Sequence, residues 1–170
     1  APANAAMRKA ANRGKLIHAL FERITDSESF KTAEQWLAVQ ARNEDIDTGQ
    51  LLAEVNAVII DPACAPLFGP LARAEVPLAA VVGETVINGR IDRLLVEPGL
   101  VRAVDFKTGR SIPSDENGVP VPHLRQMAHY RAALQTIFPD CKVEVALLFT
   151  HAPRFITLSD EILAPYYPAS

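Results

Sequence analysis

Two aspartates and a lysine, Asp92, Asp105 and Lys107, stand in a stretch with the pattern of a β-hairpin over residues 89–110. If Pro98-Gly99 forms a two-residue turn, the register places Asp92 directly opposite Asp105, with β-carbons ~5 Å apart. A four-residue loop keeps this register, whereas a three-residue loop shifts it. Because side chains alternate along a strand, Asp105 and Lys107 share a face. The pattern therefore predicts two opposed carboxylates beside an ammonium group.

Two opposed carboxylates repel each other, and the sequence leaves three ways to relieve that repulsion. One carboxylate can be protonated. Alternatively, Arg90, which falls opposite Lys107, can pair diagonally with Asp105 while Lys107 pairs with Asp92, which gives a structural salt-bridge cluster. The third way is a divalent cation, and oxygen ligands without a nearby cysteine favour Mg²⁺ or Mn²⁺ over Zn²⁺. The hairpin alone does not decide between the salt-bridge cluster and the metal site.

Further candidate residues precede and follow the hairpin. His18 lies on a predicted helix, four residues after Gly14, where the small glycine permits a close neighbour. Gln126 and Tyr130 are also four residues apart, so they share one face of a later helix. Glu75 lies on the first predicted strand. Each has a structural alternative: a surface or core histidine, a half-buried tyrosine beside a solvated glutamine, and a glutamate at an exposed strand end.

Together these motifs resemble those of a known nuclease family. Asp92 followed by Asp105-Phe106-Lys107 resembles the PD-(D/E)XK signature. Gly14-x-x-x-His18 and Gln126-x-x-x-Tyr130 are similar to motifs of its RecB-type branch, most of all the C-terminal nuclease domain of the AddA subunit of bacterial AddAB helicase–nucleases. The resemblance implies a Mg²⁺-dependent DNA nuclease, with Mn²⁺ as a substitute, that acts in double-strand break repair and recombination.

The resemblance also implies a role for each site residue. The residues expected to hold the metal ion are His18, Asp92, Asp105 and Phe106, the last through its carbonyl oxygen. Lys107 is expected to orient or deprotonate the attacking water and to stabilise charge on the phosphate. Gln126 and Tyr130 are expected to position the lysine or the DNA strand, and Glu75 to orient the lysine.

The expected partners follow from the same resemblance. They are DNA, a helicase part of the same polypeptide and an AddB-like partner subunit in the cytoplasm, and a start without methionine fits a domain cut from a longer protein. The alternatives are a catalytically silent domain that binds DNA or docks a subunit, a standalone RecB-like exonuclease, and a structural α/β domain. The two cysteines, Cys64 and Cys141, are too few for the four-cysteine iron–sulfur site of some relatives, and we expect separate thiols.

The composition is that of a globular domain without a general attraction for DNA. The chain has 170 residues, 49% of them hydrophobic, a formal net charge of −3, and no apolar run long enough to cross a membrane. Attraction to DNA must then be local, from the metal or from basic residues near the motifs. These residues are Arg13, Lys15, Arg90, Arg93, Arg110 and Arg125.

The elements that position these residues predict an α/β fold. Residues 1–70 are expected to be mainly helical, with helices from Met7 to about Ile24, from a cap at Asp26, Ser27 or Ser29 through Val39, and over residues 48–60, then a loop with one short turn. Strands are expected at 72–82, 85–97, 100–108, 142–150 and 154–159, with a polar loop at 110–122 and a helix at 123–138. The prediction is one nuclease domain over residues 1–170, with a restriction-endonuclease-like core: a mixed central sheet flanked by helices, after an N-terminal helical segment that carries His18.

Overall fold

In the computed structural model, the described residues are 2–24 and 27–169, and the chain begins with three helices. These are α1 (Pro2–Arg23), α2 (Ser27–Gln40) and α3 (Thr48–Ile60). The first helix starts five residues before its predicted beginning, because the alanine-rich opening is itself a good helix former. Of the cap candidates, Asp26 lies outside the described residues, Ser27 opens α2 and Ser29 falls inside it.

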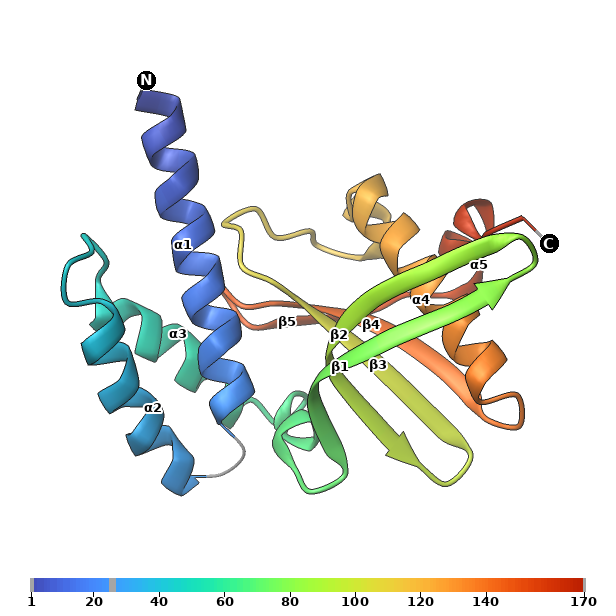
Figure 1. Cartoon of the computed structure of the whole chain (residues 1–170), viewed down its shortest axis with the longest axis horizontal. Coiled ribbons are helices and arrows are strands. Elements are labelled where there is room, and N and C mark those ends of the chain that lie inside the picture. The colour runs from blue at the N-terminus through green and yellow to red at the C-terminus, as the bar shows by residue number, and fades with distance from the viewer. Residues whose placement is uncertain (1, 25–26, 170) are drawn as a thin grey trace.

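A five-stranded sheet follows, and its strands lie side by side in chain order. The strands are β1 (Ala72–Val82), β2 (Thr85–Glu97), β3 (Leu100–Lys107), β4 (Lys142–Phe149) and β5 (Arg154–Thr157). All neighbours are antiparallel except β3 and β4, which are parallel and are connected by α4 (Val121–Ile137). The mixed sheet flanked by helices confirms the predicted fold class (Figure 1).

Short helical turns occupy the loops of the sheet half. They are η1 (Ala65–Phe68), η2 (Glu116–Gly118), α5 (Asp160–Leu163) and η3 (Ala164–Tyr166). The first of these is the turn expected in the loop before the sheet, and both cysteines are free, as predicted. Among the described residues, no helix has the length and apolar character needed to cross a membrane.

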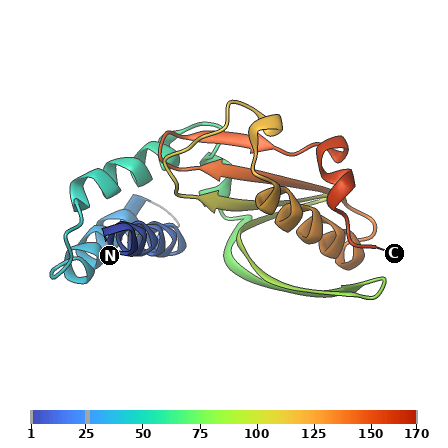
Figure 2. The same cartoon turned by 90° about the horizontal axis from the view of Figure 1, so that it is seen from above.

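The β2–β3 hairpin has the predicted register, but its pairing stops before the aspartates. The ladder runs from Glu97 opposite Leu100 to Arg93 opposite Val104. Beyond that pair β3 stays with β4 as far as Lys107, whereas the β1–β2 hairpin curves away from the rest of the sheet, as Figure 2 shows. A gap therefore opens between the two strands at the level of the predicted site.

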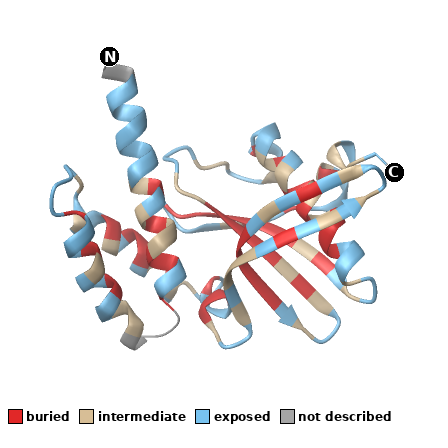
Figure 3. Ribbon diagram, in the orientation of Figure 1, coloured by how far each residue is buried: buried red, intermediate tan, exposed pale blue. Residues whose placement is uncertain are grey.

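The sheet separates two hydrophobic cores. On one face Val104 and Phe106 pack against α1–α3, with Ile17 and Phe21 of α1 fully buried. On the other face Ala103, together with Leu94 and other residues of β2, packs against α4. Figure 3 shows buried residues concentrated in the sheet centre, while the N-terminal half of α1 is exposed and projects from the body. The two cores hold α1 and α4 on opposite sides of β3, and both helices reach its end.

Candidate active site

Asp92 occupies the gap where β2 leaves β3. Its Oδ2 accepts a hydrogen bond of 2.7 Å from the backbone N–H of Phe106. The carboxylate thus takes the place of the carbonyl that a continuous ladder would offer to this N–H. Asp92 is 8% exposed and Asp105 is 6% exposed, so both carboxyls are buried. The two predicted aspartates are brought together, although they do not form a backbone pair.

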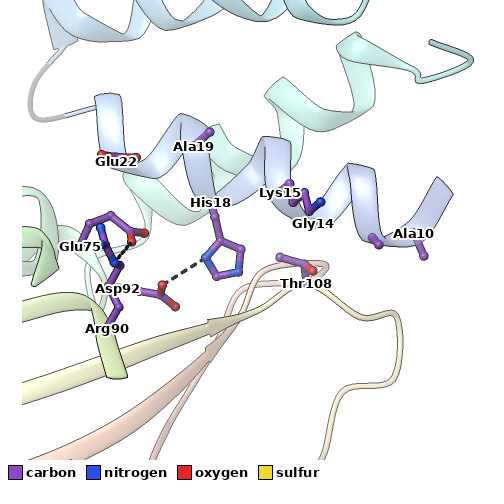
Figure 4. Close-up of a pocket in the computed structure, with 11 residues that line it drawn as sticks. Ala10, Gly14, Lys15, His18, Ala19, Glu22, Glu75, Arg90, Asp92 and Thr108 are labelled. Atoms are coloured by element: carbon purple, nitrogen blue, oxygen red, sulfur yellow. Dashed lines mark hydrogen bonds and ion pairs between the residues drawn. The ribbon is translucent and has the colours of Figure 1, made fainter. Parts of the chain in front are cut away.

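His18 reaches Asp92 from α1 on the other side of the gap. Its Nδ1 lies 3.2 Å from Oδ1 of Asp92, and Figure 4 shows the ring pointing from the helix toward the carboxylate. The helix can approach this closely because of Gly14: a β-carbon there would lie 2.9 Å from Oγ1 of Thr108. The close neighbour predicted for Gly14 is therefore Thr108, the residue directly after β3.

Lys107 begins a row of polar contacts toward α4. Its Nζ lies 2.7 Å from Oδ2 of Asp105 and donates a hydrogen bond of 3.0 Å to Oε1 of Gln126. Nε2 of Gln126 lies 3.4 Å from the hydroxyl of Tyr130, which in turn donates to the carbonyl of Arg90 at 3.4 Å. The predicted pair on α4 thus contacts both the lysine and β2.

Gly89 is a residue that the sequence reasoning missed. A β-carbon at this position would lie 2.5 Å from the hydroxyl oxygen of Tyr130 and 2.6 Å from a ring carbon. Such a contact is too short for any real side chain, so only glycine lets the tyrosine ring lie against β2. A glycine in the middle of a predicted strand was the signal for this close approach.

The ion pairs of the site differ from the diagonal pairs considered for a salt-bridge cluster. Lys107 pairs with Asp105 of its own strand, and Nε of Arg90 lies 3.8 Å from Oε2 of Glu75. The Arg90–Asp105 and Asp92–Lys107 pairs, one of the alternatives that the sequence left open, are not the pairs formed by the described side chains. The reason is the divergence of β2 from β3, which removes the cross-strand geometry on which that arrangement depends.

Glu75 has a backbone conformation that is unusual for its type. Its φ is +52°, in the left-handed region, which is sparsely occupied by residues other than glycine. It interrupts the β1–β2 ladder, which pairs Ala74 with Arg93 and Val76 with Ile91. Such local strain concentrates at functional sites. The interruption places Glu75 at the same level of the hairpin as Asp92.

Burial and mutual charge shift the acid–base properties of the site. Burial, together with the negative charge of Asp92, raises the pKa of Asp105 to about 6, against the opposing effect of Lys107. Burial alone would raise the pKa of Asp92 too, but the hydrogen bond and charge of His18 and the N–H of Phe106 hold that pKa below its usual value. The site therefore contains one carboxyl that ionises readily and one that resists ionisation.

The other two titratable groups respond to the same charges. Burial by itself lowers the pKa of His18, but the hydrogen bond to Asp92 and the nearby carboxylates outweigh it, so the pKa is raised. Burial and the charge of Asp92 raise the pKa of Glu75. The carboxyls of Glu75 and Asp92 and the imidazole of His18 thus face a shared space that favours a cation.

Three of these residues could share one metal ion. One ligand atom from each of His18, Glu75 and Asp92 lies within 4.8 Å of the others. Carboxylate oxygens with an imidazole nitrogen suit a divalent cation, so the residues fit the predicted ion. Asp105 is not in this group and contacts Lys107 instead, while Phe106 contacts Asp92 through its N–H. The ligand role of the Phe106 carbonyl stays a prediction.

An open cleft of about 570 Å³ gives access to this group. It lies between α1 and the β1–β2 hairpin, and His18, Glu75, Asp92 and Thr108 line it (Figure 4). Two small residues of α1, Ala11 and Gly14, line it as well and leave the helix surface flat. The cleft admits a ligand to the metal-binding side chains from the solvent.

Two of the six basic residues that could contact phosphates form internal contacts of the fold instead. Arg13 forms an ion pair with Glu54, and Arg93 is 2% exposed and donates to the carbonyls of Phe21 and Ile24 at the end of α1. Neither guanidinium is free for a phosphate, so these two of the six candidate residues are not available for such a contact. The remaining four basic residues, Lys15, Arg90, Arg110 and Arg125, are exposed.

Comparison with known proteins identifies a family. The sequence model of the PD-(D/E)XK nuclease superfamily matches residues 1–155. No curated protein matches the chain. Among solved structures, the chain is similar to SSO0001, with 18% sequence identity and a TM-score of 0.38 over 88% of this chain and 71% of that chain.

Proposed function

Because the chain belongs to the PD-(D/E)XK nuclease superfamily, we propose that its site hydrolyses phosphodiester bonds in DNA with Mg²⁺, for which Mn²⁺ can substitute. The observation that carries the proposal is the position of Asp92 in the gap between β2 and β3. Its two oxygens contact His18 and the N–H of Phe106, and the Asp105–Lys107 pair lies beside it. This arrangement supports a metal-dependent hydrolase more than a purely structural cluster.

The metal ion would be held by residues from three elements. We propose His18 of α1, Asp92 of β2 and Glu75 of β1, which lie within reach of one ion, with Asp105 as a further ligand. A bound divalent ion polarises a phosphoryl oxygen and makes water a stronger nucleophile. Glu75 takes a more direct part here than the lysine-orienting role expected from the sequence.

Lys107 is the group that we propose to act on water and phosphate. Hydrolysis forms a bond from a water oxygen to phosphorus and breaks the bond to one sugar oxygen, which takes up a proton. The ammonium group of Lys107 has three donors, of which Asp105 and Gln126 engage two. The remaining donor can orient the water or stabilise charge on a phosphate oxygen.

Gln126 and Tyr130 are proposed as positioning residues. Gln126 contacts both the lysine and the tyrosine, and Tyr130 rests on Gly89 and bonds to the carbonyl of Arg90. These contacts restrict the long lysine side chain to one direction, which reduces the entropy lost when a substrate binds. Of their two predicted roles, the contacts support the positioning of the lysine.

The finer predictions concern the biological setting. A catalytically silent DNA-binding or subunit-docking domain is less favoured, because the acidic residues, the histidine and the lysine meet at one place. Membership of the AddA branch, a helicase part of the same polypeptide, an AddB-like partner and a role in double-strand break repair stay predictions from the sequence. So do the standalone exonuclease alternative and the cytoplasmic location.

A cleavage assay with a matched variant tests the proposal. End-labelled linear DNA, both double- and single-stranded, is incubated with the protein and Mg²⁺, Mn²⁺ or EDTA. We expect cleavage with either ion and none with EDTA, and we expect Asp105→Ala to lose it while Glu144→Ala, on the neighbouring strand, retains it. Full Mg²⁺-dependent activity in Asp105→Ala would refute the proposed mechanism.

A further inference from the structure

Glu54 is a buried carboxylate that the proposed chemistry does not use. It lies on α3 and is 8% exposed, among apolar residues of the helical core. A buried carboxylate is unfavourable unless charged or hydrogen-bonding groups surround it. Its presence in a helix that contributes no residue to the cleft calls for a physical reason.

Both oxygens of Glu54 are engaged by distant parts of the chain. Oε2 forms an ion pair with the guanidinium of Arg13 on α1. Oε1 accepts a hydrogen bond of 2.9 Å from Oγ1 of Thr150, directly after β4. Thr150 is fully buried, so water does not compete for this bond. One side chain thus links three separate elements.

The same two partners hold the end of β3. Nη1 of Arg13 donates to the carbonyl of Thr108 at 3.3 Å, and the N–H of Thr150 donates to the carbonyl of Lys107 at 3.0 Å. Glu54 is therefore connected to the backbone of Lys107, the proposed catalytic lysine, through a single intervening residue, Thr150. On the α1 side, Arg13 precedes Gly14, which lies against Thr108, and His18 follows five residues later.

We propose that Glu54 is a positioning residue that fixes α1, and with it His18, relative to the end of β3 that carries Asp105 and Lys107. The inference rests on the metal site of the proposed function. Five residues of helix correspond to about 7.5 Å along its axis, so a shift at Arg13 is transmitted directly to His18. Glu54 acts through its contact with Arg13 on α1 and its contact with Thr150, which bonds to the end of β3.

Hydrophobic packing alone does not supply this precision. The apolar residues of α1 that face the core are buried, but apolar contacts are non-directional and tolerate small sliding and rotation. The charged and hydrogen-bonded contacts to Glu54 have defined geometry. At the other end of α1, Arg93 bonds to the carbonyls of Phe21 and Ile24. Losing the Glu54 contacts should therefore displace the part of α1 before His18 without releasing the helix.

Glu54→Gln is the variant that tests the inference. The amide keeps the shape and an oxygen for Thr150 but removes the charge opposite Arg13. The matched control is Glu144→Gln, which removes the charge from the Arg102–Glu144 pair at the opposite end of β3. If Glu54→Gln fails to fold, Thr150→Val is the alternative. It removes the hydrogen bond from Thr150 to Glu54 but leaves the Arg13–Glu54 ion pair, and it is also expected to displace α1.

The first measurement is a crystal structure of metal-free Glu54→Gln. We expect α1 to be displaced around Arg13 and the 3.2 Å contact between His18 and Asp92 to be lost, while Glu144→Gln keeps it. An unchanged His18–Asp92 contact in Glu54→Gln would overturn the inference. This readout depends on neither metal nor activity, so it separates the positioning role from the proposed function.

The second measurement is Mn²⁺ affinity by calorimetry, in a double-mutant cycle with His18→Ala. We expect Glu54→Gln to weaken binding roughly tenfold, and to have little further effect once His18 is removed, because both changes act through one ligand. Equal effects with and without His18 would overturn the inference. If the wild type binds Mn²⁺ but cleaves no DNA, the proposed function fails while the positioning role stands. If it binds no Mn²⁺, the crystal structure alone decides.

Discussion

The two ends of β3 carry their charged residues in different ways. At the turn end, Arg102 pairs with Glu144 at 2.8 Å, both side chains remain partly exposed, and the ladder to β2 is continuous. At the other end Asp92 and Asp105 are buried, and β2 has left the ladder. At the turn end, opposite charges are paired and accessible to water. At the other end, two carboxylates lie close together with little access to water, which is unfavourable without a cation.

Two features near Asp105, at the end of β3 that β2 has left and that we call the open end, are energetically unfavourable. Glu75 has a positive φ, and burial with the charge of Asp92 raises the pKa of Asp105 to about 6. The turn end shows the reverse, since the hydrogen bonds from Lys142 and Arg102 lower the pKa of Glu144. Proteins accept such local destabilisation where a site must be ready for its ligand. We infer that the open end is arranged for function and the turn end for stability.

The largest expected difference between the ends is in catalysis. Lys107→Ala should lower kcat for DNA cleavage roughly 10²–10³-fold, the usual loss when a charge-stabilising group is removed. The control is Arg102→Ala, five residues earlier on the same strand, which should keep near wild-type activity. Steady-state rates with Mg²⁺ check both variants. Equal losses at the two positions would mean that the ends do not differ in function.

The next difference is in stability without metal. The raised pKa of Asp105 means that the folded protein binds its proton more tightly than the unfolded chain. This contribution to stability is fully present below pH ~4 and is lost as the pH rises through about 6. Asparagine has no proton to lose, so Asp105→Asn should be more stable than the wild type at pH 7 by roughly 3 kcal/mol.

Urea unfolding of the metal-free proteins between pH 4 and pH 7 checks the predicted stability of Asp105→Asn. This pH range spans the titration of Asp105. The stability difference between Asp105→Asn and the wild type should grow across this range. Adding Mn²⁺ should reverse the order at pH 7, because only the wild type keeps the full set of carboxylates. A constant difference across the pH range would show that Asp105 does not carry the destabilisation.

A smaller effect is expected where β2 diverges and Tyr130 fills the space. Gly89→Ala places a β-carbon 2.5 Å from the tyrosine hydroxyl. Overpacking costs about 1–3 kcal/mol, and alanine recovers ~0.5–1 kcal/mol in strand propensity, so the net loss should be about 1 kcal/mol. Thermal unfolding measures it. In a Tyr130→Leu background the penalty of Gly89→Ala should disappear, and its persistence would contradict the packing argument.

The smallest effect is expected at the turn end. Glu144→Gln removes the charge from a partly exposed pair, which is worth less than ~1 kcal/mol. The loss should shrink further at high salt, since exposed pairs are screened. Urea unfolding at low and high ionic strength checks this. A loss of stability in Glu144→Gln that exceeds the gain of stability in Asp105→Asn would contradict the proposed contrast between the two ends of β3.

Local patterns in the sequence predicted much of the fold. Strand-like segments separated by turn residues located β1 and β2 at their observed bounds, and the Pro98-Gly99 turn set the register from Glu97 to Arg93. The helical i, i+4 spacing correctly placed Gln126 and Tyr130 on one face of α4. These features depend on neighbours in the chain or on a single turn. For that reason one sequence was sufficient to predict them.

Other features depend on contacts between distant residues. The separation of β2 from β3 follows from the curvature of the whole hairpin, and it invalidated the diagonal ion pairs. Glu54 meets Arg13 across 41 positions and Thr150 across 96, and none of the three belongs to a recognisable motif. The place of Glu75 beside Asp92 depends on one unusual φ. Such contacts are set by packing, which local patterns do not encode.

The most direct test of the central claim is a crystal structure of the wild type soaked with Mn²⁺, with the ion located by its anomalous scattering. We expect an ion in the cleft between α1 and the β1–β2 hairpin, coordinated by Asp92 together with His18 or Glu75. Lys107 should lie beside the ion and not among its ligands. Ordered Mn²⁺ only at surface carboxylates elsewhere, with the cleft empty, would show that these residues do not form the metal site.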